Sequence, residues 1–432
     1  MSTWEPPVEL SREELIKVSE QVLARPDIPM KVSEHIFRTR AADLDWDIVC
    51  EVFEPEDSSN IPIGADGKKV GMLFLHGGGG DHRSMRPFAR LLTSKFGCKV
   101  VCMSYPGRCY LENANHDWPG DTINADGTVR TPNWLRGLKI TRNQYEVIRD
   151  RSDPKILKKR GTVIAAVAKE GTEFFNRMAA WPMAFEVGGI EVCRWHMPEG
   201  EYTVYGHGHS TGGPFINMLS QRIPNFGGIG AMENSPFGQI YAAMSGTYWN
   251  YPFNYLAMRT WRDTARYRGP ENGLEGAMRL PMLMEEILEE WDKIKVLAGF
   301  KGEGMISWGN VDTCAAAGRA TAKHLRLDDR ETEALVKHYR GYTRELAGPG
   351  VKPVPPLLLG VAERSVDHSI ARYQEVVLPA YAAMNPPPKV RLTAYRAGIH
   401  KYMTPEPGLP MGCGSATAKL WMEAIANGYY TT

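Results

Sequence analysis

The stretch Tyr202–Pro214 reads YTVYGHGHSTGGP and sets one serine among four glycines and two histidines, where an apolar run ends. The residues from Gly208 to Gly212 fit the pattern G-x-S-x-G. A serine on a sharp strand-to-helix turn needs neighbours without a Cβ atom, because strand and helix approach closely there. The pattern therefore predicts a nucleophile at Ser210, beside a helix N-terminus that favours developing negative charge. The alternative is a serine that only caps the following helix.

A second glycine loop lies upstream, in the segment VGMLFLHGGGGD at residues 70–81. Its near-continuous apolar run is typical of a strand buried on both faces of a parallel sheet. The backbone N–H groups of Gly78 and Gly79 carry no shielding side chain, so we expect them to bind an oxyanion together with the N–H of Thr211. The alternative is a flexible glycine linker, but linkers do not usually follow an apolar strand so abruptly.

Strand and helix patterns alternate along the chain, which predicts an α/β fold with a doubly wound, mostly parallel sheet. The N-terminal part adds an amphipathic helix over 8–24, capped by Ser11 and Glu14, and an antiparallel strand over 45–55. The predicted elements after the first glycine loop are helices at 82–97, 162–178, 214–221 and about 369–384, and strands at 99–107, 201–206, 228–234, 355–363 and 389–395.

Two segments interrupt this pattern. Residues 107–160 read as an irregular excursion, and residues 237–349 as a mostly helical cap or lid inserted into a core formed by 1–236 and 350–432. The second segment holds the aromatic cluster YWNYPFNYLAMRTW, from which we expect Tyr248, Trp249 and Phe253 to contact a bulky substrate. The alternative is that these rings only pack the insertion's own small core.

The composition excludes several classes of protein. With 43% hydrophobic and 23% charged residues and a net charge of +1, the 432-residue chain has no bulk attraction to nucleic acid or to anionic membranes. Neither a secretory signal pattern nor a long apolar run is present. The seven cysteines are scattered without a CxxC pair, which favours reduced thiols in the cytoplasm.

The motifs also argue against a cofactor. The loop HGGGGD lacks the G-K-[ST] ending of a phosphate-binding loop, and GHGHSTGG lacks the G-x-G-x-x-G spacing of a dinucleotide site. The residues around His82 and His116 show no metal-ligand spacing. We therefore expect neither a metal ion nor an organic cofactor.

A general base is needed to activate the serine, and His400 is the best candidate among the eleven histidines. It lies in the loop after the last predicted strand, in KVRLTAYRAGIH. His368 follows the preceding strand, whereas His207 and His209 flank the serine too closely in sequence to reach its hydroxyl comfortably. The alternative is that His400 is a solvated loop residue.

Together, HGGGGD after one strand, GHSTGG after another and a histidine after the final strand resemble the α/β-hydrolase family. The resemblance covers about residues 45–106, 160–236 and 350–425. It implies a serine nucleophile at Ser210, a base at His400 and a carboxylate that orients the base.

The position of this carboxylate departs from the common family pattern. In that pattern the acid follows the penultimate strand as G-x-x-D, but alignment of LLLGVAERSVDH places Ser365 there, between Glu363 and Asp367. In some relatives the acid instead follows the strand after the nucleophile helix, and here that strand ends in Glu233. We prefer Glu233, with Asp367 and then Glu363 as alternatives.

These residues predict acyl transfer to water through an acyl-enzyme. The expected substrate is an ester, lactone or amide of a bulky apolar or aromatic small molecule. Two alternatives remain open: a carbon–carbon bond hydrolase acting on a β-diketone-like compound, and a non-catalytic binding protein on the same scaffold. We expect no nucleic-acid or membrane partner, and the sequence leaves open whether the chain forms a homo-oligomer.

Overall fold

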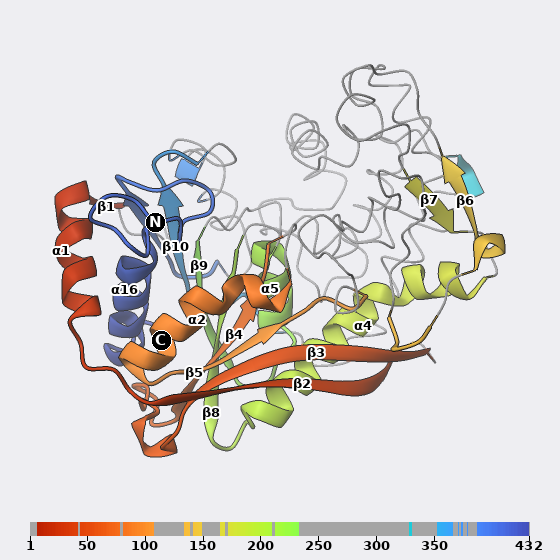
Figure 1. The fold of residues 1–432 in the computed structure, drawn as a ribbon, viewed down its shortest axis with the longest axis horizontal. Helices are drawn as coiled ribbons and strands as arrows, with labels where there is room; N and C mark the ends of the chain where they lie inside the picture. Colours follow the sequence, from red (N-terminus) through yellow and green to blue (C-terminus); the bar gives the residue numbers. More distant parts are fainter. Residues whose placement is uncertain are drawn as a thin grey trace.

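The structure is a computed structural model built around a nine-stranded sheet (Figure 1). The described residues are 7–41, 44–77, 81–107, 134–138, 141–148, 165–168, 172–209, 212–232, 328–330, 352–365, 370, 373–374, 378 and 387–431. The strand order is β1-β11-β10-β9-β8-β4-β5-β3-β2. Six of its eight junctions are parallel, and the two that flank β3 are antiparallel.

The strands of this sheet are β1 (Val8–Leu10), β2 (Met30–Ala41), β3 (Leu44–Pro55), β4 (Lys69–Leu75), β5 (Lys99–Met103), β8 (Tyr202–Gly208), β9 (Phe226–Met232), β10 (Leu357–Ala362) and β11 (Val390–Tyr395). A separate two-stranded antiparallel sheet consists of β6 (Tyr145–Ile148) and β7 (Ala165–Ala168). The helices are α1 (Arg12–Leu23), α2 (Arg86–Phe96), α4 (Glu173–His196), α5 (Gly212–Ser220) and α16 (Gly414–Ala426), with short 3-10 turns η1 (Ser58–Asn60), η2 (His82–Met85) and η3 (Arg142–Gln144).

Helices cover both faces of the sheet, as two neighbouring residues of β8 show. Neighbouring residues of a strand point to opposite faces, so their contacts report on both sides of the sheet. On β8, a Cβ atom at Gly206 would lie 2.4 Å from Ile216 of α5. The next residue, His207, instead packs against the rings of Phe88 of α2 and Trp421 of α16. Figure 1 shows α1, α16 and α2 grouped together. The predicted α/β fold with a doubly wound, mostly parallel sheet is therefore confirmed.

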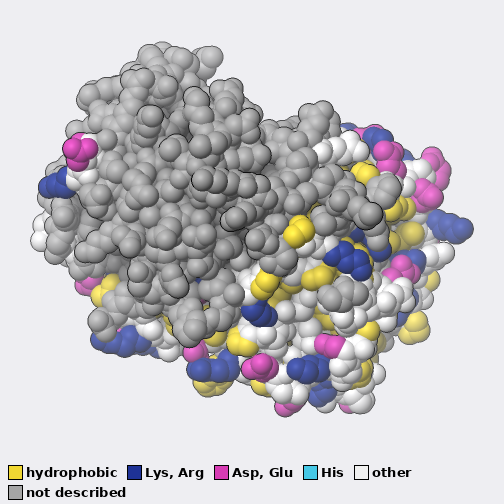
Figure 2. Space-filling view, turned by 180° about the vertical axis from the view of Figure 1, so that it is seen from behind, with side chains coloured by type: hydrophobic (Ala, Val, Ile, Leu, Met, Phe, Trp, Pro, Cys, Tyr) yellow, Lys and Arg dark blue, Asp and Glu magenta, His cyan; other side chains and the backbone are white. Residues whose placement is uncertain are grey.

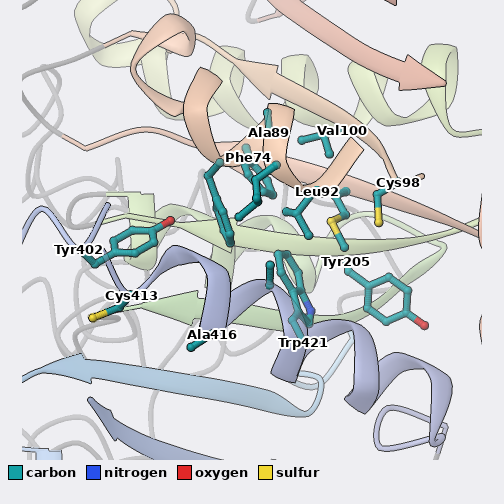
Figure 3. Packing of buried hydrophobic residues seen from close by; sticks show 14 of the residues in the cluster. Phe74, Ala89, Leu92, Cys98, Val100, Tyr205, Tyr402, Cys413, Ala416 and Trp421 are labelled. Carbon is teal, nitrogen blue, oxygen red and sulfur yellow. The ribbon is translucent and has the colours of Figure 1, made fainter. Parts of the chain in front are cut away.

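The core beneath α2 and α16 is aromatic (Figure 3). Phe74 of β4 stacks on Phe88 at 5.4 Å and on Trp421 at 6.1 Å between ring centroids. Tyr402 joins the same cluster from the loop after β11 and points its hydroxyl toward Phe74 in Figure 3. Burial of several large rings in one cluster stabilises the contact between the helices and the sheet.

Several element boundaries differ from the sequence-based expectation. Val8–Leu10 is a strand paired with β11 rather than the start of the first helix, although the capping box of Ser11 and Glu14 is present as predicted. The prediction of a helix over 162–178 was wrong in its first half, where residues 165–168 form strand β7; the helix α4 begins at Glu173 and continues to His196. Strand β2, helix α16 and strand β6, which lies within the irregular excursion expected at 107–160, were not predicted. Of the expected cap, only residues 328–330 lie within the described part of the chain.

Charge is mixed on the face seen in Figure 2, where basic and acidic side chains alternate over the described surface. No helix in the described part of the chain is both long and apolar enough to cross a membrane.

Candidate functional site

The turn between β8 and α5 is closely packed. A Cβ atom at Gly208 would lie 2.0 Å from the carbonyl oxygen of Gly212, so a side chain cannot be accommodated there. The carbonyl of His209 accepts a hydrogen bond of 2.8 Å from the N–H of Gly212. These contacts explain both glycines of the G-x-S-x-G pattern, since strand and helix meet at backbone distance. Ser210 and Thr211 lie outside the described residues.

The same turn rests on the end of β4. The N–H of His209 donates to the carbonyl of Leu75 at 3.1 Å. A Cβ atom at Gly212 would lie 2.4 Å from that carbonyl oxygen and 3.0 Å from the carbonyl oxygen of His76. The start of the HGGGGD loop and the serine turn are therefore in direct backbone contact, although Gly78 and Gly79 lie outside the described residues.

A tyrosine fixes the start of the glycine loop. The hydroxyl of Tyr105 donates to the carbonyl of His76, and the rings of the two residues lie 3.9 Å apart. Tyr105 is itself held by edge-on contacts with Phe185 of α4 and Phe215 of α5. The backbone just before the glycines is thus anchored to both helices on this face.

The predicted base lies beside the serine turn. Nε2 of His209 is 2.9 Å from the carbonyl oxygen of His400, and the two imidazole rings lie 5.0 Å apart. Because a carbonyl oxygen only accepts, Nε2 of His209 carries the proton. Burial, followed by the charge of His400, lowers the pKa of His209 to about 4. His209 is therefore neutral at pH 7 and adds no positive charge next to His400.

A second histidine of β8 supports the same loop. The hydroxyl of Tyr402 lies 2.7 Å from Nε2 of His207, and Nδ1 of His207 lies 2.5 Å from the carbonyl oxygen of Gly230. The carbonyl assigns the proton to Nδ1, so Tyr402 donates to Nε2. Burial lowers the pKa of His207 to about 3, which keeps this imidazole neutral. The two contacts connect the His400 loop to β8 and β9.

A carboxylate closes the other side of the loop. Glu406 binds Arg12 of α1 at 2.9 Å, the guanidinium of Arg364, and the N–H of Gly398 at 3.0 Å. Burial alone would raise the pKa of Glu406, but the hydrogen bond from Arg12 and the charge of Arg364 lower it below its ordinary value. The segment before and after His400 is therefore held by charges from two distant parts of the chain.

Of the three carboxylates considered for the triad, only Glu363 lies within the described residues. Glu363 follows β10, is half-exposed, and lies 3.9 Å from Arg396. Its neighbour Ser365 donates its N–H to the carbonyl of Ala362 at 3.1 Å, which closes a turn. Glu233 and Asp367 lie outside the described residues, as do Tyr248, Trp249 and Phe253 of the expected lid.

A second chain of serine, histidine and carboxylate occurs elsewhere in the structure. Nδ1 of His82 lies 3.3 Å from the hydroxyl of Ser104, and its Nε2 lies 3.1 Å from a carboxylate oxygen of Glu34. Ser104 is only 1% exposed, and the imidazole is reversed relative to a catalytic triad, in which Nε2 faces the serine and Nδ1 the carboxylate. This trio connects β2, η2 and the end of β5, and we assign it a structural role.

Three residues that position the His400 loop were not identified from the sequence, namely His207, His209 and Tyr402. The alternation of His207 and His209 along a strand was visible, but their partners are far away in the chain, 191 residues in the case of His209. Among the described residues, no group of three histidine, cysteine, aspartate or glutamate side chains could hold a metal ion.

No family model matches the sequence, and no curated protein matches it. Similar solved structures include acetyl xylan esterase 1 from Thermoanaerobacterium, 13% identical with a TM-score of 0.35 over 99% of this chain and 96% of that one. A lipase in an open form is 13% identical with a TM-score of 0.40, over 91% and 100% of the two chains. Dienelactone hydrolase from Anabaena variabilis is 11% identical with a TM-score of 0.34, over 91% and 98%. At these values the likenesses carry no argument about chemistry.

Proposed function

We propose that this chain, which has the α/β-hydrolase fold, is a serine hydrolase that cleaves an ester, lactone or amide of a bulky apolar or aromatic small molecule. The parallel strands β4, β8, β9, β10 and β11 end at one edge of the sheet, where such folds bind their ligands. The loops that follow these strands carry every residue to which we assign a role in the core.

One observation carries the proposal: the hydrogen bond of 2.9 Å between His209 and the backbone of His400. Ser210 follows His209 directly in the sequence, so this bond brings the loop of the base to the turn of the nucleophile. A Ser–His pair is recognised by such convergence of distant segments rather than by sequence order.

In the proposed reaction, His400 accepts the hydroxyl proton of Ser210 while the serine oxygen attacks the substrate carbonyl. The N–H groups of Gly78, Gly79 and Thr211 stabilise the oxyanion. The tetrahedral intermediate collapses to an acyl-enzyme, and the imidazolium returns its proton to the leaving group. Water activated by the same imidazole then hydrolyses the acyl-enzyme, which releases the acid and restores the serine.

We propose that residues 237–349 form a lid that determines which substrates bind. In this lid, Tyr248, Trp249 and Phe253 contact the apolar part of the substrate. Glu233 is the proposed acid, with Asp367 as the alternative. The described cysteines Cys50, Cys98, Cys102, Cys193 and Cys413 are all free, which fits a reducing compartment such as the cytoplasm.

Labelling with a fluorophosphonate tests the proposal most directly, because the reagent phosphonylates a serine only where a base activates it. We expect one label per chain, located on the peptide that contains Ser210, and none in Ser210→Ala. The control is Ser104→Ala, which should label like the unaltered protein. Unlabelled wild-type protein with no esterase activity would favour a non-catalytic binding protein instead.

A substrate panel tests the reaction class. Esters, lactones and amides with acyl groups of rising size should show kcat/KM increasing toward the apolar, bulky members. A labelled protein that cleaves only β-diketones would assign the carbon–carbon bond reaction to the same residues. A preference for acetyl groups would contradict the proposed lid.

A further inference from the structure

Strand β2 forms one border of the nine-stranded sheet (Figure 1). All twelve residues, Met30–Ala41, pair with β3 on the inner side. Among the described residues, no strand pairs with the outer side of β2. A long outer strand presents unpaired backbone donors and acceptors, which makes it a template for pairing with another strand.

Backbone contacts of β3 establish which residues of β2 face outward. The N–H of Asp47 donates to Trp134, and the carbonyl of Val49 accepts from Ser104, so the backbone groups of odd residues of β3 point away from β2. Val49 pairs with Ile36. Because bonding alternates along an antiparallel ladder, the backbone groups of Ile36 and of the other even residues of β2 point to the outside.

The outward-facing positions bear charges placed about Ile36. Two copies of β2 that pair antiparallel about Ile36 set Glu34 of each copy opposite Arg38 of the other. Registers that centre on Glu34 or on Arg38 instead place like charges opposite each other, which is unfavourable. The side chains of Glu34 and Arg38 are 49% and 56% exposed while bound to His82 and Asp47, so they are already held near the edge.

Apolar side chains accompany this charge pattern on both faces of the strand near its centre. Ile36 is 49% exposed, and Trp195 of α4 is 69% exposed. The ring of Trp195 stacks on Phe37 at 6.4 Å with an interplanar angle of 14°. Exposed aliphatic and aromatic groups on both faces of an edge strand are typical of an interface.

We propose that the outer edge of β2 binds a second copy of this chain, by antiparallel pairing about Ile36 that joins the two sheets. Backbone hydrogen bonds at even positions hold the two strands together, and the Glu34–Arg38 crossings set the register. The stacked Phe37 and Trp195 extend the contact on the α4 face. The inference does not depend on the proposed enzymatic function.

Charge reversal tests the partner and the register together. The unaltered protein should sediment as a dimer at micromolar concentration, whereas Arg38→Glu and Glu34→Arg should each weaken the dimer by about tenfold or more, because each puts like charges at both crossings. Mixing the two variants should restore dimers that contain one copy of each, since both crossings then join opposite charges. Circular dichroism and melting temperature check that each variant is folded.

Disulfide trapping provides a second measurement. Hydrogen-bonded residues opposite each other in an antiparallel pair have Cα atoms about 5.5 Å apart, which a disulfide can span. Ile36→Cys should therefore form a covalent dimer under mild oxidation, while Arg40→Cys, which faces Val32 in this register, should not. A monomeric wild-type protein at ~100 μM, or a dimer that survives both charge variants, would overturn the proposal.

Discussion

Two buried histidine networks in this protein make similar hydrogen bonds in different places. His82 connects Ser104 to Glu34 with the residue types of a catalytic triad, but its Nδ1 faces the serine and its Nε2 the carboxylate, the reverse of the order in a triad. The imidazole of His209 instead donates to the backbone carbonyl of His400, at the ends of the parallel strands. The first network therefore shares only the residue types of a triad, and its Ser104 is buried. The second lies at the ends of the parallel strands, beside the G-x-S-x-G turn, and among the described residues it contains no carboxylate.

This difference teaches that a hydrogen-bonded serine, histidine and carboxylate do not by themselves identify an active site. The turn after β8 contacts the glycine loop after β4 through Gly212, and the His400 loop through His209. Ser104 instead stands in the sequence CMSYPG, which does not fit G-x-S-x-G. Catalytic function is therefore expected where backbone donors, a base and a sharp turn converge.

The largest expected effect separates the two serines. Ser210→Ala should lower kcat by up to ~10⁶-fold, because the nucleophile is lost, whereas Ser104→Ala should leave kcat within about threefold and lower only the melting temperature. Ester hydrolysis and thermal unfolding of both variants measure this. Equal losses of kcat in the two variants would break the comparison.

The acid of the proposed triad is expected to have the next largest effect. Glu233→Gln should lower kcat about 10⁴-fold, because the amide no longer stabilises the imidazolium, whereas Asp367→Asn should change it little. Steady-state kinetics on one ester, with both variants measured side by side, decide between the carboxylates. The reverse outcome would assign the acid to Asp367, after β10.

Loss of the His209 contact should have an intermediate effect. His209→Leu removes the donor to the carbonyl of His400, so we expect kcat to fall about 10²-fold with KM little changed, as for a base displaced by about 1 Å. His209→Gln keeps an amide donor near the same place and should recover most of this loss.

The matched control is His196→Leu. His196 lies at the opposite end of β8 and contacts Cys50 and His35, so its loss should not affect kcat. If His209→Gln were as inactive as His209→Leu, the hydrogen bond to His400 would not be what positions the base.

The smallest expected effect is on stability in mild acid. In the folded chain the pKa values of His207 and His209 are lowered from 6.5 to about 3 and about 4. As the pH falls below about 6.5, these two histidines become protonated in the unfolded chain but stay neutral in the folded chain. The free energy of unfolding therefore decreases between about pH 6.5 and pH 4. By linkage the loss is about 2 kcal/mol for each histidine at pH 5.

Urea unfolding at pH 7.5 and pH 5 measures this effect. His207→Asn keeps an amide donor toward Gly230 but does not titrate, so its stability should depend less on pH than that of the unaltered protein. An unchanged pH dependence in this variant would place the acid sensitivity in another group.

The sheet could largely be predicted because its central strands are buried on both faces. Runs such as Val70–Leu75 admit few interpretations other than a covered parallel strand. Strand β2 could not be found in this way, because most of its side chains are exposed on both faces and the period-2 pattern is lost. Val8–Leu10 is a strand only through pairing with β11, which local sequence does not reveal.

The candidate site was predictable in its motifs but not in its supports. Gly208 and Gly212 were explained from the sequence, and their close backbone contacts have the predicted cause. The contact of His209 with His400, and the bond from Tyr402 to His207, join segments almost 200 residues apart in the chain. Such contacts depend on the path of the whole chain, so no local pattern contains them.

The carboxylate of Glu406 couples the effects of substitutions at two arginines that lie far apart in the sequence. Arg12 near the beginning of the chain and Arg364 near its end share this one acceptor. Substitutions at these two sites should therefore give non-additive changes in stability, as residues of one salt-bridge network do. Mutations among the first dozen residues would accordingly act on the loop of the proposed base, and their tolerance during evolution would depend on what stands at Arg364.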